Sequence, residues 1–176
     1  MFIEKIEEIQ TRLISKKNYL YLIARQDNKK YDAGFLKKNG ITPPKNFYQW
    51  HIKRQSEYSA SRFLIKYALS KMNLPTNQPT YRKNLAPKWH ENTKGCISHK
   101  DQMVIVIVIK NSDIIAAIDI ERMMSEMLYR KIGSRIINSK EKEELEKKKY
   151  DKSFYYTLLF SAKESIIKLG KIYQIR

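Results

Sequence analysis

The sequence contains little cysteine, glycine and proline, and it has no long hydrophobic segment. Of its 176 residues only Cys96 is a cysteine, so no disulfide can form within the chain, which suits a reducing compartment. Five glycines and five prolines are too few for a low-complexity or linker protein. The longest strongly apolar run, Met103 to Ile109, is too short to cross a bilayer, and residues 1–17 lack the basic-then-apolar order of a secretory signal. We therefore expect a soluble cytoplasmic protein with no membrane partner.

Acidic side chains are also scarce. The chain has 35 Lys and Arg against 18 Asp and Glu, a formal net charge of +17. Between Ala33 and His90 the one acid, Glu57, stands among eleven Lys and Arg. This balance favours an anionic partner and leaves open whether it is nucleic acid, acidic lipid, an acidic protein or a polyphosphate. A hydrophobic content of 42% allows a packed core, in one domain or in two small halves that share it.

The spacing of apolar residues predicts two helices in the first half of the chain. The first covers residues 3–15. The second, the clearest of the two, covers residues 53–72, and its basic Arg54, Arg62 and Lys66 should lie outside the core. The short apolar run from Tyr19 to Ala24 fits either a strand or a buried helical turn.

A β-hairpin is predicted after these elements. Residues 103–109 are rich in β-branched side chains and predict a strand, and residues 114–121 predict the strand that returns. Alternation along that second strand places Asp119 and Glu121 on the same face. Paired carboxylates suit Mg²⁺, but two solvent-facing acids at a strand end are the more common arrangement.

Helices dominate the predicted structure from Met123 onward. Asn138 and Glu141 have the spacing of a capping box, which would begin a charged helix. A last helix is predicted from about residue 154 to residue 169, ending at Gly170.

Three charged residues of this last helix attract attention. Glu164 and Lys168 are four residues apart and share a helical face, with Lys163 beside them. They form either a surface ion pair worth about 0.3–0.5 kcal/mol or a carboxylate that completes a metal site, with lysines on phosphate oxygens. The apolar residues around them favour the second interpretation.

The sequence Gly-Cys-Ile-Ser-His at residues 95–99 offers a hydroxyl and an imidazole just before the apolar strand. Ser98 and His99 could bind a phosphate together, although a serine and a histidine in an ordinary loop are more common. Cys96 has no second histidine near it in sequence and does not suggest a nucleophile.

These weak motifs gain specificity from their order. Residues 95–99 are followed by Ala-Ile-Asp-Ile-Glu at 117–121 and by Phe-Ser-Ala-Lys-Glu-Ser-Ile-Ile-Lys at 160–168. This set resembles the motifs of the 4′-phosphopantetheinyl transferase superfamily. Residues 53–62 and Pro-Lys-Trp at 87–89 are similar to further segments of its enterobactin synthase component D branch. The resemblance extends over roughly residues 45–170.

The resemblance implies an α/β (α+β) fold of two similar halves, each with a small antiparallel sheet and a long helix. We expect an N-terminal half over residues 1–110, which grips coenzyme A, and a C-terminal half over residues 111–176, which carries the metal and catalytic residues. Only six residues follow Gly170, so we expect a second half-sheet that is truncated relative to the family.

The implied activity is the Mg²⁺-dependent transfer of 4′-phosphopantetheine from coenzyme A to a serine of an apo acyl or peptidyl carrier protein, with release of adenosine 3′,5′-bisphosphate. The branch that the chain resembles suggests a role in siderophore synthesis or in other nonribosomal peptide or polyketide synthesis. The implied metal ligands are Asp119, Glu121 and Glu164. Glu164 is also the implied general base, and Lys168 would assist the leaving phosphate. The other implied phosphate contacts are Arg54, Arg62, Lys88, Ser98, His99 and Lys163. Leu85 stands where the family has an arginine, so Lys83 or Lys88 would substitute.

Two other functions remain open at this stage. A net charge of +17 with twelve tyrosines would also suit a basic nucleic-acid-binding module with stacking aromatic rings. No motif of such a module is present. Nucleic-acid binding would also leave the acidic residues Asp119, Glu121 and Glu164 without a role. A transferase-like protein that binds its ligands without catalysis is the third possibility.

Overall fold

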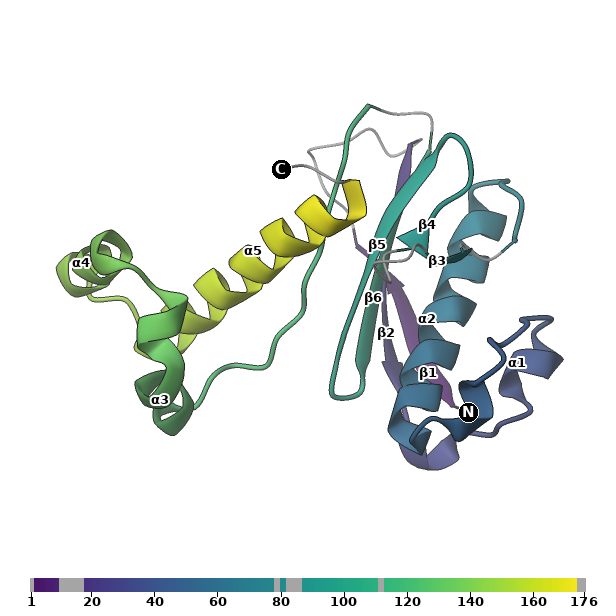
Figure 1. Cartoon of the computed structure of the whole chain (residues 1–176), viewed down its shortest axis with the longest axis horizontal. Helices are drawn as coiled ribbons and strands as arrows, with labels where there is room; N and C mark the ends of the chain where they lie inside the picture. Colours follow the sequence, from purple (N-terminus) through teal and green to yellow (C-terminus); the bar gives the residue numbers. More distant parts are fainter. Residues whose placement is uncertain (1, 10–17, 78–79, 82–86, 111–112, 174–176) are drawn as a thin grey trace.

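A four-stranded antiparallel sheet forms the centre of the computed structural model, which describes residues 2–9, 18–77, 80–81, 87–110 and 113–173 (Figure 1). The strand order is β1-β2-β6-β5, so that β5 is an edge strand among those described. The strands are β1 (Ile3–Glu8), β2 (Tyr19–Gln26), β5 (Thr93–Lys100) and β6 (Met103–Lys110). A separate pair of short strands, β3 (Thr80–Tyr81) and β4 (Pro87–Lys88), lies between α2 (Ile52–Lys71) and β5 in the chain.

One face of the sheet is covered by helix α2, as Figure 1 shows. Alternate residues of β6 point to this helix, because successive side chains on a strand face opposite sides. Val104, Val106 and Val108 thus pack with Leu64 and Ala68 of α2 in the main core. The helix is covered in turn by α1 (Phe35–Lys38) and η2 (Phe47–Gln49), and η1 (Asn28–Lys30) contacts it where Ser56 donates a hydrogen bond to Asn28.

The opposite face of the sheet is covered by an extended segment, residues 114–121. Ala116, Ala117 and Ile118 pack on a smaller core that includes Cys96 and Ile107. The chain then forms α3 (Glu126–Ile136), α4 (Ser139–Lys148) and α5 (Lys152–Tyr173), which share a core of their own. Figure 1 shows α5 running from α3 and α4 toward β5.

The helix predicted over residues 3–15 is wrong where the structure describes it, because residues 3–8 form strand β1. The cause is a break in the register between Ile3 and Lys5, which lets Ile3 and Ile6 both pack on the main core. A bulge of this kind turns the two-residue period of a strand into a spacing of three, which imitates a helix. Residues 10–15 lie outside the described part of the chain.

The predicted hairpin is also wrong in its pairing. The strand over residues 103–109 is confirmed as β6, but its hairpin partner is β5, which precedes it. Residues 114–121 form no strand and lie over the face of the sheet. Ala116, Ala117 and Ile118 pack against that face without strand pairing, whereas Ile114 and Ile115 are exposed.

Other local predictions had mixed outcomes. The helix over residues 53–72 is confirmed as α2, and the capping box of Asn138 and Glu141 is present at the start of α4. Helix α5 continues past Gly170 to Tyr173, so the predicted end is wrong. Arg62 lies inside the protein with 1% of its surface exposed, against the expectation that it stays outside.

The α+β class is confirmed by the four-stranded antiparallel sheet and its helices. The two similar halves and the truncation of the second remain predictions. In the described part of the chain no helix has both the length and the apolar character needed to span a membrane.

Candidate active site

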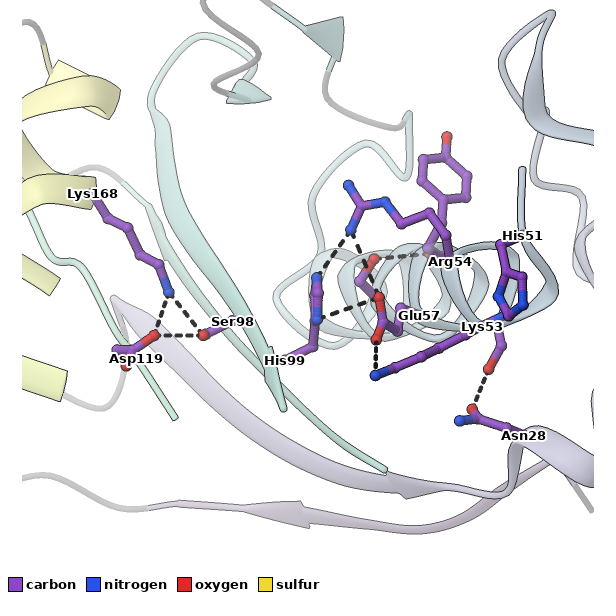
Figure 2. Close-up of polar contacts among 12 residues, drawn as sticks. Asn28, His51, Lys53, Arg54, Glu57, Ser98, His99, Asp119 and Lys168 are labelled. Carbon is purple, nitrogen blue, oxygen red and sulfur yellow. Dashed lines mark hydrogen bonds and ion pairs between the residues drawn. The ribbon is translucent and has the colours of Figure 1, made fainter. Parts of the chain in front are cut away.

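Strand β5 carries the Ser-His pair, and its pleat sends the two side chains to opposite faces of the sheet. Figure 2 shows Ser98 with Asp119 and Lys168 on one side of the strand and His99 with residues of α2 on the other. The predicted pair therefore does not converge on one point. Each residue instead belongs to a separate polar cluster.

The first cluster joins three segments that are far apart in the sequence. Lys168 of α5 donates hydrogen bonds to Ser98 Oγ at 2.8 Å and to Asp119 Oδ1 at 2.5 Å. Ser98 Oγ donates to the same Asp119 oxygen at 2.9 Å. Lys168 also reaches the carbonyl oxygen of Ile118 at 3.4 Å. We call Ser98, Asp119 and Lys168 the Asp119 cluster.

Burial and charge determine the state of Asp119. Burial acts to raise the pKa of this carboxyl group, but the hydrogen bonds from Lys168 and Ser98, with further help from Ser161, outweigh it and hold the pKa below its ordinary value. The side chain is only 4% exposed. Asp119 is therefore an ionised carboxylate whose charge is neutralised by the Lys168 ammonium.

The Asp119 carboxylate suits a divalent metal in its chemistry. Its second oxygen, Oδ2, is buried and has no partner at hydrogen-bonding distance among the residues that the structure describes, with Ser161 as a further neighbour of the carboxyl group. A buried carboxylate oxygen with free lone pairs is the hard ligand that Mg²⁺ prefers. Asp119 thus provides a suitable first ligand.

The remaining predicted ligands lie in different surroundings. Glu121 Oε2 is 2.5 Å from Lys100 Nζ, two residues along β5 from Ser98. Glu164 is half-buried on α5, one turn before Lys168. Within the described ranges no three His, Cys, Asp or Glu side chains are gathered closely enough to hold a metal ion. The carboxylates of Asp119, Glu121 and Glu164 would have to come closer to one another before they could bind the same metal ion.

The second cluster lies on the α2 face of β5 and contains two predicted phosphate-binding residues. Arg54 and His99 Nε2 are 3.1 Å apart. Because a guanidinium only donates, Nε2 accepts and the ring proton is on Nδ1, 3.6 Å from Glu57 Oε2. Lys53 and Arg54 also lie within 3.9 Å of Glu57. We call Lys53, Arg54, Glu57 and His99 the His99 cluster.

Burial is the main cause that lowers the pKa of His99, and the neighbouring Arg54 adds to it, while Glu57 acts in the opposite direction. The imidazole is therefore neutral near pH 7. A neutral ring surrounded by cations can accept a proton once an anionic ligand lies beside it.

Other predicted contacts lie apart from both clusters. Lys163 points to α4, where it donates hydrogen bonds to Glu141 at 2.7 Å and to the Ile136 carbonyl at 2.5 Å. The Arg62 guanidinium lies 4.9 Å above the ring of Tyr58. Lys88 belongs to β4. Lys83 and Leu85 lie outside the described residues.

Two contributors were not recognised from the sequence. Glu57 is the acidic centre of the His99 cluster, and its spacing of three and four residues from Arg54 and Lys53 was the available signal. The second is Gly95, where a Cβ atom would come within 2.5 Å of Trp89 and of the Ile107 carbonyl oxygen. The segments 87–89 and 95–99, each of which resembles a motif of the family, are thus in contact through Trp89 and Gly95.

Comparisons with known proteins agree with the predicted resemblance. Residues 44–109 match the 4′-phosphopantetheinyl transferase N-terminal domain. The chain is 30% identical to enterobactin synthase component D of Salmonella typhimurium over 116 residues, which are 66% of this chain and 48% of that protein. It is 32% identical to enterobactin synthase component D of Escherichia coli over 120 residues, 68% of this chain and 56% of that protein. The chain spans about half the length of these relatives.

Proposed function

We propose that this chain, which carries a 4′-phosphopantetheinyl transferase N-terminal domain and resembles enterobactin synthase component D, moves the 4′-phosphopantetheine group of coenzyme A onto a carrier protein. The acceptor is a serine hydroxyl of an apo acyl or peptidyl carrier protein. The serine oxygen bonds to the phosphorus that bears pantetheine, the bridging P–O bond breaks, and adenosine 3′,5′-bisphosphate leaves. Siderophore synthesis is the process we infer from the name of the relatives.

One observation carries this proposal: Ser98, Asp119 and Lys168 belong to three separate sequence motifs and meet within hydrogen-bonding distance. Ser98 and Asp119 are 21 residues apart along the chain and Asp119 and Lys168 are 49 residues apart, so local structure alone does not explain their contact. The Lys168 ammonium and the Ser98 hydroxyl are donors of the kinds that bind and orient phosphate oxygens. The net charge of +17 supports an anionic substrate and an acidic carrier protein.

The residues divide the work by their position. Lys168 would donate to the phosphate oxygen that becomes negative as the bridging bond breaks. Glu164 lies one helical turn away on the same face of α5 and would take the proton of the acceptor serine. The His99 cluster would hold the 3′-phosphate, with Arg54 and Lys53 as its cations. Bound Mg²⁺, held by Asp119 with Glu121 and Glu164, would neutralise charge on the pyrophosphate.

Mass spectrometry tests the proposal directly. We would incubate the folded chain with coenzyme A, Mg²⁺ and several apo carrier proteins, and we expect one carrier to gain the mass of phosphopantetheine. Removing Mg²⁺ with a chelator should stop the reaction. If no carrier gains mass, the transferase proposal fails, and a protein that binds without catalysis becomes the better interpretation.

The role of Glu164 is tested by Glu164→Gln. This variant should lower transfer by about 10²–10⁴-fold while its thermal unfolding stays unchanged, since the amide cannot accept the serine proton. Glu143→Gln makes the same charge change at an exposed position of α4, where Glu143 pairs with Lys147, and should retain full activity. Undiminished transfer by Glu164→Gln would exclude Glu164 as the base.

A further inference from the structure

The Lys168 ammonium lies among three oxygen atoms, from Ser98, Ile118 and Asp119. Its three N–H groups point to Ser98 Oγ at 2.8 Å, Asp119 Oδ1 at 2.5 Å and the Ile118 carbonyl oxygen at 3.4 Å. A hydroxyl, a carboxylate and a carbonyl are also the oxygen ligands that hard divalent cations take in proteins. Figure 2 shows the lysine reaching from α5 to Ser98 and Asp119.

The Asp119 carboxylate needs a cation in every state of the site. Its side chain is 4% exposed, and a buried carboxylate without a counter-charge is strongly disfavoured. An ammonium and a divalent cation on the same oxygen would repel each other at short range. A divalent cation on either oxygen of this one carboxylate would lie close to the Lys168 ammonium on Oδ1, so the buried Asp119 pairs with Lys168 or with a metal, but not with both.

We infer that Lys168 is the resident counter-ion of Asp119 and competes with the divalent cation for it. When the metal binds, Lys168 leaves Asp119. Its ammonium becomes available to an anionic ligand, with a four-carbon side chain that is already 26% exposed. Metal binding and phosphate binding then reinforce each other, because each removes the ammonium from Asp119 or holds it elsewhere. The inference rests on the proposed function only in that the site accepts a divalent cation.

Binding of Mn²⁺ to the full chain, measured by the electron paramagnetic resonance signal of free Mn²⁺ without coenzyme A or carrier, tests the competition. Lys168→Met removes the ammonium and keeps a side chain of similar length. We expect its apparent Kd for Mn²⁺ to fall by about tenfold or more relative to the wild type. The double variant Asp119→Asn, Lys168→Met should lose this increase in Mn²⁺ affinity, because the carboxylate that binds the metal is gone.

A charge-matched control separates competition from a general change of field. Lys171→Met removes one positive charge from an exposed position three residues further along α5 and should change the Kd by less than about twofold, because exposed charges are screened. Lys168→Gln keeps a donor for Asp119 Oδ1 without the charge, and it should also bind Mn²⁺ more tightly than the wild type. It serves as the test variant if Lys168→Met does not fold.

The outcomes distinguish this inference from the proposed function. If Lys168→Met and Lys168→Gln bind Mn²⁺ no more tightly than the wild type, the counter-ion inference is overturned, even where carrier proteins are modified. If both bind more tightly and no carrier gains mass, the counter-ion inference stands and the transferase proposal falls.

Discussion

Replacing Gly95 by alanine should destabilise the protein well beyond an ordinary glycine-to-alanine change. The added Cβ would lie 2.5 Å from the Ile107 carbonyl oxygen and 2.5 Å from a ring carbon of Trp89. Ile107 belongs to β6, which is paired on both sides, so its carbonyl cannot move without parting strands. Trp89 packs against the main core. Overpacking of this kind costs about 1–3 kcal/mol, and because a backbone atom and a ring must both yield, we expect roughly 2–4 kcal/mol.

Urea unfolding followed by far-ultraviolet circular dichroism measures this loss, which corresponds to a fall in Tm of roughly 4–16 °C for a chain of this size. Gly34→Ala is the matched control, since its Cβ would meet the flexible Asp32 side chain at 3.3 Å, and it should cost less than about 1 kcal/mol. A double-mutant cycle with Trp89→Leu separates the part due to the ring from the part due to the backbone. Equal losses for Gly95→Ala and Gly34→Ala would refute the reasoning.

Two further predictions concern His99 and Lys163. The pKa of His99 in the folded chain is lowered from 6.5, so the unfolded chain binds more protons at mildly acidic pH. The free energy of unfolding should therefore fall as the pH is lowered from about 7 to 5, and His99→Gln should flatten this dependence. An unchanged slope in the variant would contradict the lowered pKa of His99. The charged groups that act on His99 are Glu57, which raises its pKa, and Arg54, Lys168 and Lys53, which lower it. Lys163→Met removes the hydrogen bonds to Glu141 and to the Ile136 carbonyl oxygen and should lower the free energy of unfolding by about 1 kcal/mol. The loss is no larger because the lysine side chain is 38% exposed and its ion pair is screened by water. Its KM for coenzyme A should stay unchanged, whereas a raised KM would support the phosphate contact implied by the family resemblance.

Local signals predicted the elements that depend on local chemistry. The capping box of α4 needs only Asn138 and Glu141 at the right spacing, and both hydrogen bonds are present. The strand at residues 103–109 follows from a run of β-branched side chains buried on both faces. Helix α2 was found although it is buried around much of its circumference, because no proline or glycine interrupts it.

Predictions failed where distant contacts decide the structure. The sequence has no marker for the bulge in β1, whose spacing of Ile3 and Ile6 imitates a helix. Arg62 looked like a surface residue because its aromatic partner, Tyr58, is one turn away on a helix face that the pattern did not identify as buried. The family resemblance implies a metal ligand in Asp119 and a phosphate contact in Ser98, but the hydrogen bond between them cannot be derived from their spacing.

The division of Ser98 and His99 between two faces has a consequence for how a ligand can bind. Neighbouring residues on a strand point to opposite sides, so a single phosphate cannot contact both side chains. A ligand that reaches both must pass around β5, which is an edge strand of the described sheet. Coenzyme A is suited to this, because it carries phosphate both on its ribose and in its pyrophosphate. We therefore expect the two clusters to bind different phosphates of one molecule, so that Arg54→Ala weakens coenzyme A binding without altering Mn²⁺ affinity.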